Sequence, residues 1–179
     1  SALACVAPLL SEEQSLPGLH GKLKTSHPWK EQLSPHWVRV RAVMDSGAAK
    51  SIAPPSMATG DRVQASEMSS RGQSFIIARD GRIPIQGQQI LTISTNEGRY
   101  GKTCCQIGEV NRPLTSITQT CDAGNHVIFT ADGGYNYSLT DGSYTRLERH
   151  SNIYELDQWL KSDDADSDVW QPGFARLGY

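Results

Sequence analysis

Residues 37–48, WVRVRAVMDSGA, decide the fold. Apolar and basic residues alternate at the start of this stretch, which then becomes wholly apolar up to Asp45. A period of two predicts a β-strand, and the apolar end indicates that the strand enters the interior. Ser46 and Gly47 follow at once, and glycine permits a tight turn and a close approach of the backbone. The sequence therefore predicts one carboxylate at the end of a buried strand.

The rest of the chain alternates short apolar stretches with turn residues. Pro54 and Pro55 are expected to stop any regular element after residue 52, and residues 57–71 are polar and predict a loop. A short helix is expected at about residues 116–121, with Gly124 ending it. Many short strands with Gly-rich turns predict an all-β fold. The further strands that we expect are residues 74–78, 82–85, 89–94, 103–108, 127–130, 135–139, 144–148 and 153–156.

The chain has 179 residues, a length that suits one domain with tails. Residues 1–35 mix Pro, Gly and polar residues without a sustained period, so we expect a flexible N-terminal arm. Residues 36–130 form the main domain in this interpretation, and residues 131–160 a β-meander extension. Four aspartates make residues 161–179 an acidic tail.

Composition and charge exclude several classes of protein. A net charge of −2 gives no sign of a nucleic-acid-binding surface, and no apolar run of 18 residues predicts a membrane span. The four cysteines and five histidines match no zinc-binding spacing, so we expect neither a metal nor another cofactor. Cys104 and Cys105 would point to opposite faces of a strand, which favours free thiols and a reducing, intracellular compartment.

A single carboxylate at residue 45 has one chemical use if a second copy of the turn lies against it. Two carboxylates a few ångström apart share a proton, so that one activates water and the other polarises a carbonyl. Ala48 is small enough for the second turn to press against it. Asp141-Gly142-Ser143 has Gly and Ser in the wrong order and no apolar strand before it, so the chain offers one such turn. Activity would therefore need a homodimer with Asp45 from each copy. The alternative is an ordinary Asx-turn.

Residues 43–48 resemble the active-site turn of retropepsins, especially those of copia-type retrotransposon polyproteins. The stretch RPLTSI at residues 112–117, followed by DAGNHVIF at 122–129, is similar to the copia-type segment that leads into a short helix and a closing strand. Retroviral members usually have Gly near the position of Ser116. A favoured two-residue turn at Asp80-Gly81 predicts a hairpin where the family has its flap.

The resemblance implies a retropepsin-like acid protease barrel whose short helix packs behind the catalytic turn. It implies that Asp45 is the catalytic acid and base, supported by Ser46 and Gly47. The residues that it implies for substrate binding are Ala48, Ile77, Ala78, Arg79, Asp80 and Gly81.

Two functions of different classes follow. The first is a homodimeric aspartic endopeptidase that cleaves a peptide or processes a polyprotein. The second is a catalytically silent, protease-like fold that serves as a structural or interaction subunit of a larger assembly. The oligomeric state separates the two, because a strict monomer cannot assemble a pair of Asp45 carboxylates.

Overall fold

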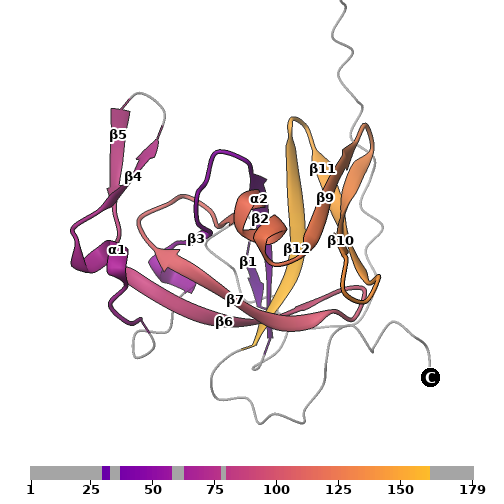
Figure 1. Cartoon of the computed structure of the whole chain (residues 1–179), viewed down its shortest axis with the longest axis horizontal. Helices are drawn as coiled ribbons and strands as arrows, with labels where there is room; N and C mark the ends of the chain where they lie inside the picture. Colours follow the sequence, from indigo (N-terminus) through magenta and orange to yellow (C-terminus); the bar gives the residue numbers. More distant parts are fainter. Residues whose placement is uncertain (1–29, 33–36, 58–62, 78–79, 162–179) are drawn as a thin grey trace, which may run out of the picture.

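A computed structural model describes residues 30–32, 37–57, 63–77 and 80–161. Most of the expected N-terminal arm lies outside the described residues, as do the acidic tail after Lys161 and the expected flap residues Ala78 and Arg79. The structure is mostly β, so the predicted all-β class is confirmed (Figure 1).

Ten strands form one sheet in the order β1-β2-β8-β3-β7-β6-β12-β11-β10-β9, and β12 also pairs with β2. The second pairing of β12 closes β2, β8, β3, β7, β6 and β12 into a ring (Figure 1). The bounds are β1 Lys30–Gln32, β2 Trp37–Asp45, β3 Ile52–Ala53, β6 Gly87–Thr95, β7 Tyr100–Ile107, β8 Leu114–Ser116, β9 Asn125–Thr130, β10 Gly133–Ser138, β11 Tyr144–His150 and β12 Ile153–Lys161. A separate two-stranded sheet contains β4 Ser74–Ile77 and β5 Gly81–Pro84.

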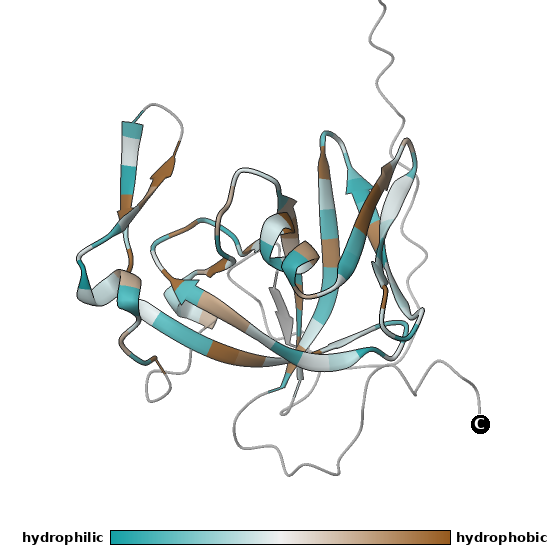
Figure 2. Cartoon of the chain, viewed as in Figure 1, coloured by the Kyte–Doolittle hydropathy of each residue, from teal (hydrophilic) through white to brown (hydrophobic). Residues whose placement is uncertain are grey.

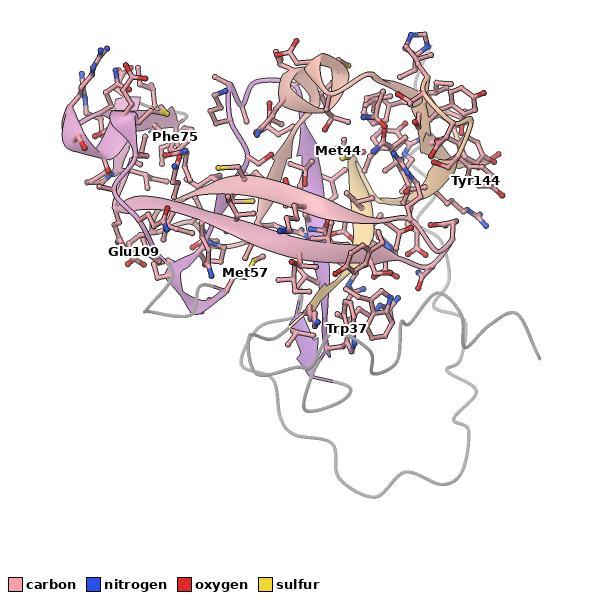
Figure 3. The ribbon with its side chains drawn as sticks, turned by 60° about the horizontal axis from the view of Figure 1, so that its bottom comes forward. Trp37, Met44, Met57, Phe75, Glu109 and Tyr144 are labelled. Atoms are coloured by element: carbon pink, nitrogen blue, oxygen red, sulfur yellow. The ribbon has the colours of Figure 1, made fainter. Side chains whose placement is uncertain are left out.

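The predicted strand at residues 37–44 is confirmed as β2, and its apolar side chains supply the core. Val40 and Ala42 are almost fully buried, and Val40 packs in one cluster with Leu91, Ile107 and other residues. Met44 belongs to a second cluster with two leucines from β11 and β12. Figure 3 shows Trp37 and Met44 far apart along β2, so the strand runs through the molecule and carries its last residue to one end.

A partly buried ion pair connects β12 to β2. The Arg39 guanidinium donates to both carboxylate oxygens of Asp157, with Nη2 to Oδ2 at 2.6 Å. Asn96 donates to the same carboxylate at 3.0 Å and accepts from the indole N–H of Trp159 at 3.0 Å. Asp157 is 4% exposed. Its charge is therefore matched by donors from β2 and from the turn after β6.

The expectation of one short helix is wrong, because α1 (Glu67–Ser70) lies in the stretch predicted as a loop. Ser66 and Ser69 form a reciprocal capping box, which satisfies backbone N–H groups at the start of this helix. A 3₁₀ turn, η1 (Pro55–Met57), precedes it. The predicted helix near residue 116 is present as α2 (Ile117–Asp122), and Gly124 follows it with φ of +80°.

Two further expectations are corrected by strand pairing. Residues 52–53 form β3 although Pro54 follows, because β3 lies between β7 and β8 and is held by their ladders. The expected two-residue turn at Asp80-Gly81 is not observed. Gly81 is already the first residue of β5, where it pairs with Ile77 of β4, so the hairpin loop ends at Asp80. Asp80 is the last loop residue and has a φ of +60°, the position that a three-residue hairpin loop needs.

The expected boundary at residue 130 does not separate two sheets. β9 ends at Thr130, and β10, β11 and β12 continue in the same sheet beside it. β12 then pairs with β2 and β6, which lie well before the boundary. Among the described residues, the meander therefore completes the ring of strands.

Candidate active site at the turn after β2

Asp45 is the last residue of β2, and its carboxylate is held by the turn that follows. The backbone N–H of Gly47 donates to Asp45 Oδ1 at 2.7 Å. A Cβ on Gly47 would lie 3.3 Å from the same oxygen, so glycine gives the room for this contact. Oδ2 accepts no hydrogen bond within the described part of the chain. The carboxylate is therefore fixed through one oxygen and has the other available.

The exposed part of the turn consists of three small residues and Lys50. Asp45 is half-buried, whereas Ser46, Gly47 and Ala49 are exposed. Ala48 points inward and is 9% exposed, so the expectation that a second copy would press on Ala48 needs correction. The surface that another molecule could reach is formed by Ser46, Gly47 and Ala49, with the Lys50 side chain at its edge.

Ser116 supports the turn from behind. β8 lies parallel to β2 and pairs Ser116 with Asp45. The hydroxyl of Ser116 donates to the carbonyl oxygen of Ala48 at 2.6 Å, and its backbone N–H donates to Ser51 Oγ at 3.0 Å. Ser116 is 0% exposed. Both ends of the turn are therefore tied to one buried residue.

Helix α2 extends this support. Ser116 is its N-cap and accepts a hydrogen bond from the backbone N–H of Gln119 at 3.1 Å. The Gln119 side chain accepts from Ser51 N at 2.9 Å and donates to the carbonyl of Cys104 at 3.2 Å. The helix therefore packs behind the turn and links it to β7. Sequence reasoning missed Ser51 and Gln119 as site residues. For Gln119 a signal was present, because Ser116 followed by Gln three residues later is a capping pattern.

The hairpin β4–β5 presents apolar side chains to solvent. Ile76 is 74% exposed and Ile77 47%, and Figure 2 shows β4 as a strongly hydrophobic strand. The base is anchored, because Ile85 is buried and its N–H donates to the carbonyl of Gln73 at 3.2 Å. In the view of Figure 1, the hairpin and the segment after β2 both lie at the top. Asp80 at the tip is exposed and Gly81 half-buried.

Asp141 is an ordinary turn residue, as its sequence context predicts. Its Oδ1 accepts hydrogen bonds from the backbone N–H of Ser143 at 3.0 Å and from its hydroxyl at 2.7 Å. These bonds lower the pKa of Asp141 to about 2. Its carboxylate is therefore ionised in an exposed turn, where it cannot serve as the proton-sharing partner of Asp45.

The cysteines of the described region are free thiols. Cys105 is buried, Cys104 half-buried and Cys121 exposed. Burial, with a smaller contribution from Cys104, raises the pKa of the Cys105 thiol to about 12. No group of three or more His, Cys, Asp or Glu residues within the described ranges could hold a metal ion. None of the described helices is long and apolar enough to cross a membrane.

No family model matches the chain, and neither does any curated protein or solved structure. Its function is therefore inferred from the residues of the turn, of the strands behind it and of the hairpin.

Proposed function

We propose that the chain is a retropepsin-like aspartic endopeptidase that acts as a homodimer, with Asp45 of each copy in the catalytic pair. The observation that supports this proposal most strongly is the geometry of the Asp45 turn. A carboxylate at the end of a buried strand is held by Gly47 N and braced by buried Ser116, while its second oxygen has no partner among the described residues.

The chemistry follows from bringing two such carboxylates together. When they lie a few ångström apart, the repulsion between like charges favours a state in which the two share one proton at mildly acidic pH. The ionised Asp45 takes a proton from water as the water oxygen attacks the peptide carbonyl carbon, and the protonated one donates to the carbonyl oxygen. The pair then returns a proton to the leaving amine nitrogen.

The exposed surface of the turn suits a two-fold contact. Ser46, Gly47 and Ala49 have no long side chain that would keep the backbones of two turns apart. An isologous contact across a two-fold axis would place the same turn of each copy face to face. The substrate would then be an extended peptide lying between the turns and the hairpin. Ile76 and Ile77 would contact its apolar side chains and exclude water when the hairpin closes.

The test is Asp45→Asn, which keeps the size of the side chain and removes its acid and base chemistry. We expect wild-type protein to run as a dimer in size-exclusion chromatography with light scattering and to cleave a peptide library at mildly acidic pH. We expect Asp45→Asn to lose cleavage while retaining its circular dichroism spectrum. Asp141→Asn is the matched control, because Asp141 lies in an exposed turn, and it should cleave like wild type. Wild-type activity in Asp45→Asn would refute the mechanism.

A second function, a catalytically silent interaction subunit, is favoured by the outer face of β9, β10 and β11. Ile128, Tyr135, Tyr137 and Tyr144 are each 40–50% exposed there. The register places Tyr135 opposite Ile128 and Tyr137 opposite Tyr144. Aromatic surface of this kind is enriched at protein interfaces. A monomer that cleaves no peptide would support this second function.

A further inference from the structure

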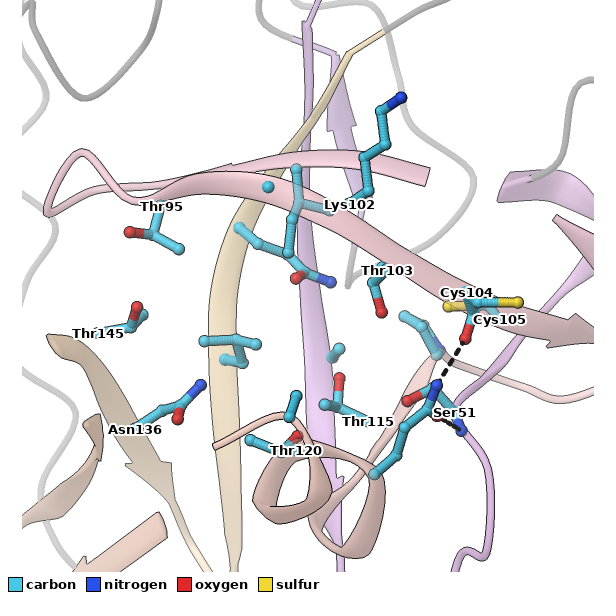
Figure 4. Close-up of a pocket in the computed structure, with 18 of the residues that line it drawn as sticks. Ser51, Thr95, Lys102, Thr103, Cys104, Cys105, Thr115, Thr120, Asn136 and Thr145 are labelled. Atoms are coloured by element: carbon cyan, nitrogen blue, oxygen red, sulfur yellow. Dashed lines mark hydrogen bonds between the residues drawn. The ribbon is translucent and has the colours of Figure 1, made fainter. Parts of the chain in front are cut away.

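A partly open cavity of about 280 Å³, with both apolar and polar side chains on its wall, lies on the side of α2 and β8 that faces β6 and β7. We call it the polar cavity. Figure 4 shows side chains from several elements around it, among them Thr95, Thr103, Thr115, Asn136 and Thr145. Asp45 does not line it. This volume is near the lower end of the range for ligand pockets.

Three polar groups on its wall lack hydrogen-bond partners. Asn136 Oδ1 is buried and has none. Thr145 is 2% exposed and Gln158 is 5% exposed, and neither side chain makes a hydrogen bond within the described part of the chain. Burying a polar group without a partner costs about 1–3 kcal/mol. Among the described lining residues, Asn136 Oδ1 alone bears this cost. The side chains of Thr145 and Gln158 reach the cavity space, so a molecule in the cavity would provide partners for groups from β10, β11 and β12.

The charges on the wall indicate the sign of that molecule. Its charged residues are Arg99 and Lys102, and the described lining includes no Asp or Glu. The Arg99 guanidinium is held in place because it donates to the carbonyl of Asn136 at 3.2 Å and to Asn125 Oδ1 at 2.9 Å. Figure 4 shows the Lys102 side chain pointing away from the other lining side chains. The Arg99 guanidinium is therefore the positive charge at the wall, and it suits one carboxylate.

The uncharged groups on the wall indicate hydroxyls on the ligand. Five threonines line the cavity, and their hydroxyls both donate and accept, as do the amides of Gln158 and Asn136. A ligand hydroxyl is matched to such groups because it also does both. Access is available at one side, since Tyr100 is 53% exposed and Lys102 is exposed.

We propose that the polar cavity binds a small hydroxylated carboxylate. Asn136, Thr145 and Gln158 hydrogen-bond its hydroxyl groups, and Arg99 attracts its carboxylate. This site is separate from the Asp45 turn and does not depend on peptide cleavage. The ligand also stabilises the native state, because it binds only where β10, β11 and β12 are assembled.

The test uses isothermal titration calorimetry on the full chain with glycerate and threonate as probes. Two comparators separate the sources of affinity: propionate lacks the hydroxyls, and glycerol lacks the carboxylate. We expect binding of both probes at millimolar concentration, with each comparator at least about fivefold weaker. Addition of either probe should also raise the thermal unfolding midpoint.

Two variants test the residues. Thr145→Val and Gln158→Met keep the approximate side-chain volume, and each should weaken glycerate binding by about five- to tenfold, the loss of one hydrogen bond. Both should unfold near the wild-type temperature, because neither substitution removes a hydrogen bond within the described part of the chain. Thr130→Val is the matched control on exposed β9 outside the cavity, and its affinity should equal that of wild type.

The proposal is overturned if neither probe binds wild type at millimolar concentration, or if propionate and glycerol bind as tightly as glycerate. It is also overturned if Thr145→Val and Gln158→Met fold and bind like wild type. Should one variant fail to fold, the other variant and the comparators on wild type still decide the outcome.

Discussion

Replacing Ser116 with Ala should loosen the support of the Asp45 turn. Ser116 Oγ donates to the Ala48 carbonyl and accepts from Gln119 N, so the substitution breaks both contacts. Loss of an N-cap hydroxyl costs about 1 kcal/mol. A buried carbonyl left without its donor costs about a further 1–2 kcal/mol. Because Ser116 is 0% exposed, no bulk water replaces the hydroxyl, and we expect a total loss of about 2–3 kcal/mol.

The assay is urea unfolding followed by far-UV circular dichroism, with thermal unfolding as a second measurement. At about 4 °C for each kcal/mol, the midpoint should fall by roughly 8–12 °C. Ser143→Ala is the matched control, because Ser143 bonds Asp141 in an exposed turn, and it should change stability by less than about 0.5 kcal/mol. If cleavage is present in wild type, Ser116→Ala should lower kcat more than it raises KM, since Ser116 positions the turn without touching substrate.

One result would refute this reasoning. If Ser116→Ala unfolds within about 0.5 kcal/mol of wild type, the two hydrogen bonds do not hold the turn, whatever its effect on cleavage. A fall in stability with unchanged kcat would instead show that the support serves the fold alone.

Two further predictions concern buried groups. Asp157→Ala should lower the free energy of unfolding, measured in urea, by about 2–3 kcal/mol. This loss is smaller than for a fully buried ion pair, because the Arg39 side chain is 31% exposed. The exposed pair of Glu67 and Arg71 is the control, and Glu67→Ala should cost less than about 0.5 kcal/mol; equal effects would contradict the prediction. Burial raises the pKa of the Cys105 thiol from 9.0 to about 12. Its contribution to the free energy of unfolding should therefore be fully present below pH 9.0 and be lost as the pH rises toward about 12. Unfolding experiments across this range should show a smaller fall for Cys105→Ala, and an identical fall in both proteins would disprove the role of the thiol.

The sequence predicts elements where a side-chain period or a turn residue leaves a local signal. β2 is predicted because apolar and basic residues alternate at its start and its end is wholly apolar, and Asp45 because the motif follows directly. β3 and β8 have two and three residues, too few for a period, and form because neighbouring ladders hold them. Ser51 and Gln119 are not identifiable as site residues from sequence, because their roles come from contacts across 65 or more residues.

β12 shows a second limit of sequence reasoning. Its apolar start at residues 153–156 was predicted, but the strand continues to Lys161 through Asp157 and Gln158. Both are buried, and hydropathy places such residues at the surface. Asp157 is buried because Arg39 neutralises it, and Gln158 because it faces the polar cavity. Only the folded arrangement supplies these two reasons.

The second pairing of β12 has a consequence for synthesis on the ribosome. Strand β2 pairs with β12 along most of its length, and the Arg39–Asp157 contact joins residues 118 positions apart in the chain. Contacts so far apart in sequence slow folding, because a long loop must close before they form. Until Lys161 leaves the exit tunnel, β2 and β6 lack this shared neighbour and their edges stay open to other chains. A nascent chain stalled before that point should therefore be sensitive to added protease and to chaperone binding.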